Sequence, residues 1–466
     1  MTRSNPSLLD HATRDLAEFA SGLAFNRIPA NVADRIKTSI LDSIGCCLFG
    51  MTLPWTQKVQ AMVEEQGGSP VASLFGCGRK TSAADAALVN ATAGHAFELD
   101  DIHKESIVHP GSIALPVAVA LAEKTGRRHG RDLMTAIVAG YEIGTRVGNA
   151  ATMDLFFRGF HPQGTSGVFV AAATAGRMLG LDAHRMQHAL GIVGSQAAGL
   201  MAAQEGAMVK RFHSGRAAQS GVYAALLADK DFTGITDVLE APYGGYLSTY
   251  SGKPNPARLT DGLGTVWETG KIGYKPHASV TSIHAALDAL AQLMQEHRLQ
   301  PDDMAGIDVG VSHMTYVHCA WEYKAQGVTA AQMNLFYSLA VMAHDGMAFV
   351  EQYRPERLAD PRILALIART TARVDPRIDA MGPAFRHAAV VTVTSASGSV
   401  YTREILHRRG SPESPLGPAD IEVKFRNIVK PCLSAGDADT VIGLVDGLDR
   451  LDDIQPLLDI LAAPRA

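Results

Sequence analysis

Apolar residues recur at three- and four-residue spacing from residue 10 to about residue 270. The segments 132–147, 168–180 and 216–230 keep this spacing, which is the period of an amphipathic helix. Their apolar positions carry Ala and Gly rather than Val and Ile, and small residues let neighbouring helices approach closely. The pattern predicts a large helical domain with these segments at its centre.

After Gly273 the sequence becomes richer in Val, Thr and Tyr. The segments 306–319 and 387–406 have this strand-like composition, and the second contains a Ser-Ala-Ser-Gly turn between two apolar runs, which predicts a β-hairpin. Helical spacing continues at 281–297 and 331–345. This part of the chain therefore predicts a smaller α+β unit.

Helical spacing returns after residues 417–425, and the C-terminal segment is apolar on one face. The simplest arrangement is a mainly α fold, in which a small α+β domain is inserted into a large all-helical domain. We place the first part of the helical domain at 1–272, the inserted domain at 273–409 and the rejoining C-terminal helices at 410–466.

The composition of the 466 residues excludes several classes of function. Hydrophobic residues make up 47%, enough for two or three folded domains. The 42 Lys and Arg residues against 47 Asp and Glu give a net charge of −5, so no strong basic field attracts nucleic acid or an anionic membrane. Aromatic residues make up only 6%, which argues against an aromatic-lined sugar or nucleobase site. We therefore expect a small polar ligand, with any anion held by a local cluster of cations.

Cysteine usage and apolar runs indicate the compartment. The five cysteines are Cys46, Cys47, Cys77, Cys319 and Cys432. Their odd number and the lack of CxxC spacing predict neither a disulfide framework nor a thiolate metal site, and they favour a reducing cytoplasm. The longest apolar run, 113–122, is half the length of about 20 residues that a membrane helix needs. We expect a cytoplasmic protein that does not bind a membrane.

The motifs that hold nucleotide cofactors or activate nucleophiles are absent. The sequence has no GxGxxG, Walker A, GxSxG or HExxH motif. What remains is a set of carboxylate, His, Lys and Tyr side chains, which suits proton transfer. No cofactor is therefore expected.

The first candidate cluster is HAFELDDIHKESIVHPGS, residues 95–112. Ser82 is expected to begin a helix with Asp85 as its capping partner. If that helix continues, His95, Glu98 and Asp101 share one face. A solvated helix end followed by a polar loop is the competing interpretation.

Two further histidines, His103 and His109, complete this cluster. A metal site is a third interpretation, but the spacings match no standard ligand motif, so no metal is expected.

Three other segments carry candidate residues. The loop 158–167 places His161 before a helix that Ser166 could cap. Residues 206–221 gather four basic side chains around Ser214, a good helix N-cap whose free N–H groups would help to bind an anion. The basic residues are Lys210, Arg211, His213 and Arg216. An ordinary basic surface turn explains them equally well.

Lys275 follows Tyr274 at the boundary between the helical region and the α+β unit. Clefts between domains are preferred ligand sites, although a lysine at a hinge need not take part in chemistry.

Four segments in this order resemble the MmgE/PrpD family: HAFELDDIH…HPGS, GFHPQGTSG, KRFHSGRAA and YKPHASVTSIH. This family comprises 2-methylcitrate dehydratase, cis-aconitate decarboxylase and iminodisuccinate epimerase. The resemblance extends over nearly the whole chain, from residues 39–50 to residues 420–425. It implies a large all-helical domain built from both ends of the chain, a smaller α+β lid, a homodimer and no organic cofactor.

The resemblance also assigns site residues. Positions that match those of the decarboxylase branch are Glu98, Ile102, His109, His161, Lys210 and Lys275, together with Tyr316, which is expected in the first lid strand. Glu98 replaces an Asp of that branch and Ile102 replaces a Thr. Ser-Ile-Val precedes His109, where the methylcitrate dehydratases have Glu-Trp-Gly. These departures favour the generic bacterial branch, to which the epimerase is similar.

We therefore expect proton abstraction next to a carboxylate of a small di- or tricarboxylic acid, with epimerisation of iminodisuccinate as the first choice. A lyase of the same family, either dehydratase or decarboxylase, is the alternative, and a non-catalytic carboxylate-binding protein ranks below both. The expected catalytic residues are His109, His161, Lys210 and Lys275. The expected substrate-binding residues are Glu98, Asp101, His103, Arg216 and Tyr316.

The position of Lys275 leads to a prediction about closure. Lys275 begins the lid, so the site should be complete only when the lid closes over a bound carboxylate. Gly270 and Gly273 are the expected hinge residues. Because like charges repel, an empty site should favour an open lid.

Overall fold

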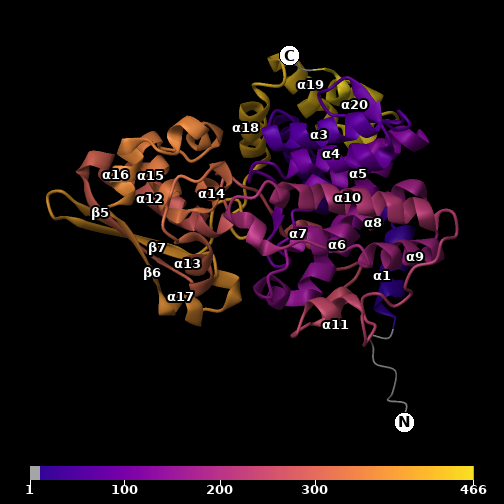
Figure 1. Cartoon of the computed structure of the whole chain (residues 1–466), viewed down its shortest axis with the longest axis horizontal. Coiled ribbons are helices and arrows are strands. Elements are labelled where there is room, and N and C mark those ends of the chain that lie inside the picture. Colours follow the sequence, from indigo (N-terminus) through magenta and orange to yellow (C-terminus); the bar gives the residue numbers. More distant parts are fainter. Residues whose placement is uncertain (1–10, 465–466) are drawn as a thin grey trace, which may run out of the picture.

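Helices account for most of the structure, as the apolar spacing predicts. The computed structural model describes residues 11–464, and its mainly α fold with a small mixed unit confirms the predicted fold class. Figure 1 shows a larger lobe, indigo to magenta with yellow C-terminal helices, and a smaller orange lobe. The helices of the larger lobe that precede the smaller one are α1 (Ala12–Gly22), α2 (Ala30–Gly50), α3 (Pro54–Gln66), α4 (Ala83–Gly94), α5 (Gly111–Thr125), α6 (Gly130–Phe157), α7 (Pro162–Thr165), α8 (Gly167–Leu179), α9 (Ala183–Gly194), α10 (Val209–Ala228) and α11 (Tyr246–Tyr250).

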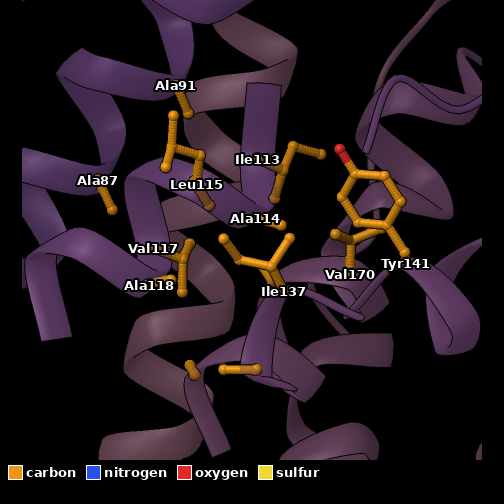
Figure 2. Close-up of a cluster of buried hydrophobic side chains, with 14 of the residues drawn as sticks. Ala87, Ala91, Ile113, Ala114, Leu115, Val117, Ala118, Ile137, Tyr141 and Val170 are labelled. Carbon is orange, nitrogen blue, oxygen red and sulfur yellow. The ribbon is translucent and has the colours of Figure 1, made fainter. Parts of the chain in front are cut away.

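Small residues bring the central helices of this lobe into close contact. Figure 2 shows Ile113 and Leu115 of α5 beside Ile137 of α6 and alanines of α4. Every residue of α5 from Gly111 to Ala122 is buried. A side chain at Gly140 of α6 would overlap Thr174 of α8. The Ala- and Gly-rich segments therefore form the centre of the helical lobe, as their composition predicts.

The smaller lobe contains one mixed four-stranded sheet, in the order β6-β5-β7-β8. Its strands are β5 (Met304–Val311), β6 (Thr370–Val374), β7 (Ala389–Ser395) and β8 (Val400–Ile405). Its helices are α12 (His284–His297), α13 (His313–Cys319), α14 (Val328–Met333), α15 (Leu335–Asp345), α16 (Pro361–Ile367) and α17 (Pro376–Ala380). Strands β5 and β6 run parallel, and the other neighbours are antiparallel.

The strand-like segments of the sequence fold only partly as expected. The hairpin predicted at 387–406 is confirmed, because β7 pairs antiparallel with β8 across the Ser-Ala-Ser-Gly turn. The segment 306–319 is a strand only as far as Val311. The side chain of Ser312 then accepts a hydrogen bond from the Thr315 N–H and begins α13. The expectation that Tyr316 lies on the first lid strand is therefore wrong, because the Ser312 cap starts a helix.

The C-terminal helices α18 (Pro418–Val429), α19 (Ala435–Asp446) and α20 (Gln455–Ala462) pack on the N-terminal part of the larger lobe. The ring of Phe425 on α18 lies against Gly45 of α2. A short hairpin of β1 (Ala72–Leu74) and β2 (Arg79–Thr81) and a two-stranded antiparallel sheet of β3 (Ile102–His103) and β4 (Ile272–Gly273) complete the lobe. Across residues 11–464 no single helix is long and apolar enough to span a membrane. The pair α2 and α3, which is bent by 80°, meets the requirements of length and composition only when its two helices are taken together.

Candidate active site

A cavity of about 630 Å³ lies where the two lobes meet. Five of the nine expected site residues line it: Glu98, His109, His161, Lys210 and Lys275. Lys275 belongs to the start of the smaller lobe, and the other four belong to the larger one. The four ordered segments of the sequence therefore converge on one cavity.

Glu98 owes its position to a sharp backbone turn. Helix α4 begins at Ser82, as expected, but it ends at Gly94 with His95 as its C-cap. Glu98 then adopts a left-handed conformation with φ of 51°, which costs a non-glycine residue about 1–2 kcal/mol. The expectation that His95, Glu98 and Asp101 share one helix face is wrong, because the helix stops before the turn.

The Glu98 carboxylate is buried among three cations. It accepts hydrogen bonds from Lys210 Nζ, from Arg211 Nη1 at 2.7 Å and from Lys275 Nζ at 3.1 Å. Lys275 Nζ also donates to Asp100 Oδ1 at 3.2 Å. We call these five residues the Glu98 cluster. Three cations against two carboxylates leave one positive charge, which suits a site for an anion.

The pKa values of the Glu98 cluster follow from burial and pairing. Burial would raise the pKa of Glu98, but Lys210, Lys275 and Arg211 hold it well below its usual range. Burial would lower the pKa of Lys275, but Glu98 and Asp100 raise it. For Lys210 burial prevails and lowers the pKa to about 8. Lys210 is therefore the member of the cluster whose charge changes near neutral pH.

His109 has one nitrogen committed and one available. Its Nδ1 donates to the Asp101 carbonyl at 2.8 Å and lies 3.3 Å from Asp100 Oδ1. Since Nδ1 must carry hydrogen to make the first bond, Nε2 is the nitrogen that can give or take a proton. His95 Nδ1 contacts the other oxygen of Asp100 at 2.7 Å, and burial lowers the pKa of His95 to about 3.

His161 forms a pair with His213. Their Nδ1 atoms lie 2.8 Å apart, so one nitrogen donates and the other accepts. Burial and the nearby Lys210 hold the pKa of His161 well below its usual range, and burial lowers the pKa of His213 to about 4. The pair is therefore neutral at physiological pH and holds one hydrogen between the two rings.

Four expected substrate-binding residues do not line the cavity. Asp101 accepts hydrogen bonds from Tyr141 Oη at 2.6 Å and from the Gly111 N–H at 3.0 Å, so it anchors the start of α5. His103 Nε2 lies 3.0 Å from Glu268 Oε2. Arg216 is exposed on α10 and donates to Gln219 on the same helix. Tyr316 is 38% exposed on α13.

Two capping expectations also fail. Ser214 lies in the interior of α10, which begins at Val209, and its hydroxyl contacts Ser112 and Gln163 instead. Lys210 and Arg211 therefore occupy the first turn of α10. Ser166 precedes α8 without capping it, because its hydroxyl contacts Tyr246 Oη.

The predicted position of Lys275 is confirmed, whereas the predicted repulsion between Lys275 and the other cations is wrong. Lys275 is fully buried and points into the Glu98 cluster, as expected. Carboxylates of Glu98 and Asp100 separate it from the other cations, however, so repulsion gives no reason for an open lid. A Cβ at Gly273 would lie 2.6 Å from the Gly410 carbonyl, so close backbone approach explains this glycine without a hinge.

Residues from distant segments complete the cavity. They include Lys104, Phe156, Met201, Gln204, Met314, His318, Arg386 and His387. Lys104 belongs to the segment 95–112, whereas the other seven residues belong to no recognisable motif and come together only through the folding of the chain. Asp100 is missed by the sequence analysis. Arg211 is named there among four basic residues but is not included in the expected site, because only the turn at Glu98 and the start of α10 determine which neighbour faces the cluster.

Within residues 11–464, two groups of side chains have donor atoms close enough for a metal ion: one comprises His103, Glu105 and Glu268, and the other lies at the Glu98 cluster. The ligand atoms of His95, Asp100 and His109 lie within 4.8 Å of one another. Asp100 is already paired with the ammonium group of Lys275, so a metal would compete with that cation. The donor set fits an anion-binding, proton-transferring site better than a metal centre.

Comparison with known proteins gives consistent results over nearly the whole chain. The MmgE/PrpD N-terminal domain matches residues 14–258, and the MmgE/PrpD C-terminal domain matches residues 277–450. Cis-aconitate decarboxylase of Aspergillus terreus is 33% identical over 97% of this chain and 96% of its own length. A cis-aconitate decarboxylase-like protein of Aspergillus oryzae is 30% identical over 99% of both chains, and human cis-aconitate decarboxylase is 27% identical over 98% of this chain and 96% of its own length.

Proposed function

Because the chain belongs to the MmgE/PrpD family, we propose that it is a lyase that decarboxylates cis-aconitate or a closely similar unsaturated tricarboxylate, without an organic cofactor. The names of its relatives support decarboxylation, whereas nothing in the comparisons supports iminodisuccinate. The proposal thus takes the lyase alternative in place of the epimerase that the sequence departures favoured.

The position of Glu98 weakens the argument from those departures. Its carboxylate is occupied by Lys210, Arg211 and Lys275. Holding cations requires a negative charge, which Asp and Glu both provide. The replacement of Asp by Glu at this position is therefore compatible with the decarboxylase chemistry.

The chemistry requires cations and one proton donor. In cis-aconitate, the carboxylate that leaves is attached to a CH2 group beside the double bond. Loss of CO2 sends the electron pair of the broken bond into a new double bond, and the original π pair takes a proton at the far carbon. Charge builds up on the carboxylate attached to that carbon, and preorganised cations stabilise such charge. The products are CO2 and methylenesuccinate.

The residues of this chain suit these roles. Lys210 and Lys275 supply cationic groups at the cavity surface. His109 is our choice for the proton donor, since its Nδ1 is fixed by the Asp101 carbonyl and lies beside the Asp100 carboxylate, which leaves Nε2 available for proton transfer. The single observation that carries the proposal is the convergence of His109 and the Glu98 cluster on one cavity.

The test is turnover of three substrates by the purified chain. Cis-aconitate should give methylenesuccinate and CO2, while iminodisuccinate and 2-methylcitrate should react at least 100-fold more slowly. His109→Asn should reduce kcat on cis-aconitate by about 10²–10⁴-fold, the usual contribution of a general acid. The matched control is His129→Asn, because His129 is exposed and makes no side-chain cap. Epimerisation of iminodisuccinate without CO2 release would contradict the decarboxylase proposal and support an epimerase instead.

A further inference from the structure

A second set of basic side chains lines the cavity apart from the Glu98 cluster. Lys104, Arg386 and His387 all contribute to its wall, and we call them the Arg386 group. Lys104 follows β3 in the larger lobe, and the other two residues precede β7 in the smaller lobe. The mechanism proposed above does not use them.

Arg386 is a buried cation that forms no ion pair with a carboxylate of residues 11–464, although the charge of Glu105 offsets part of the effect of burial on its pKa. It is only 8% exposed, and its guanidinium donates to two backbone carbonyls, those of Pro383 at 3.2 Å and Lys104. Its Nε has no hydrogen-bond partner, and within residues 11–464 no carboxylate forms an ion pair with it. Burial lowers its pKa to about 10, so it stays charged at neutral pH. A buried charge of this kind is costly unless a counter-ion compensates it.

The neighbours of Arg386 add to an anion-binding surface. His387 is 8% exposed, and its Nδ1 has no hydrogen-bond partner. Lys104 Nζ donates to the Ala384 carbonyl at 2.6 Å and to Glu413 Oε1 at 3.4 Å. Glu413 therefore compensates Lys104 in part and leaves Arg386 unpaired.

Two hydrogen bonds to the backbone carbonyl of Arg386 hold this residue in place. Ser312 Oγ and Thr315 Oγ1 donate to the Arg386 carbonyl at 2.6 Å and 2.9 Å. Both hydroxyls lie at the start of α13, the helix that also brings Met314 and His318 to the cavity. Arg386 is thus fixed relative to the lid wall of the cavity.

We propose that the Arg386 group is a second carboxylate subsite, in which the Arg386 guanidinium binds the central carboxylate, which the product retains, and so selects tricarboxylates over dicarboxylates. This inference rests on the proposed function, because it assumes that the substrate is a tricarboxylate. When one carboxylate lies at Arg386 and another at the Glu98 cluster, the third carboxylate faces apolar side chains of the cavity wall, such as Ile102 and Phe156.

Binding of two unreactive probes tests the subsite. Propane-1,2,3-tricarboxylate and glutarate share a five-carbon chain with a carboxylate at each end, and only the first has a central carboxylate. We expect Arg386→Gln to weaken binding of the tricarboxylate by about 10- to 100-fold, the usual effect of losing a charge-assisted hydrogen bond. Binding of glutarate should change less than about 3-fold, and Arg386→Lys should retain most of the tricarboxylate affinity. Titration calorimetry measures both dissociation constants.

The matched control is Arg362→Gln, since Arg362 is an exposed lid arginine paired with Asp360. It should leave both affinities unchanged. Equal weakening of the two probes by Arg386→Gln would indicate a structural role only and would overturn the subsite, as would no weakening at all. If that variant does not fold, Lys104→Gln replaces it with the same expected selectivity. Neither probe has a double bond, so a failure of the decarboxylase proposal leaves this result interpretable.

Discussion

Replacing Glu98 with Gln should destabilise the folded protein more than any other single loss of charge in the site. The variant removes the carboxylate that three buried cations share, and within residues 11–464 the acidic partner that remains is Asp100, which pairs with Lys275. The net charge of the Glu98 cluster rises from +1 to +2. Breaking a buried ion pair by removing one partner costs about 3–5 kcal/mol, because the other charge stays buried without compensation. We expect a loss in this range at pH 7, with turnover lost as well.

Urea titration of the unfolding free energy measures this effect. Glu98→Asp keeps the charge and should cost clearly less than Glu98→Gln. The control is Glu351→Gln, because Glu351 is 59% exposed in a surface pair with Arg354 and such pairs contribute about 0–1 kcal/mol. If Glu98→Gln loses less than about 1 kcal/mol, the buried cluster does not depend on this carboxylate, and the reasoning on Glu98 fails.

Two further predictions concern Lys210 and the helix core. Because the pKa of Lys210 is about 8, kcat/KM should fall as the pH rises through 8, since only the protonated amine attracts a carboxylate. Lys210→Met should remove this pH dependence. The folded state also binds the Lys210 proton more weakly than the unfolded chain does. The free energy of unfolding of the wild type should therefore increase as the pH rises from 8 toward 10.5, and the variant should lack this increase. Gly140→Ala should cost about 1–3 kcal/mol in urea titration by overlapping Thr174. Gly443→Ala, in α19 with open space around the glycine, should instead be neutral or stabilising by up to about 1 kcal/mol.

The sequence predicts the helical lobe and the hairpin well because their signals are local. Apolar spacing in segments such as 168–180 depends on neighbours within one turn, and the turn at 396–399 is set by its own residues. The five residues that reached the cavity lie in motifs whose order the sequence preserves.

The failures concern contacts that local patterns cannot encode. Asp101 was preferred to Asp100 because the helix was expected to continue past Gly94, and the left-handed turn at Glu98 reverses which carboxylate faces Lys275. Arg386 stands in no motif, and only the packing of the lid against the larger lobe brings it to the cavity.

The most direct test of the central claim is the fate of cis-aconitate in D2O. Proton and carbon NMR should show methylenesuccinate with one deuterium on its saturated CH2 carbon and none on the new terminal CH2 group, with one CO2 released per product. This position follows from proton delivery to the far carbon of the original double bond. Deuterium entering cis-aconitate without CO2 release, or a product labelled at the terminal carbon, would contradict the decarboxylation mechanism.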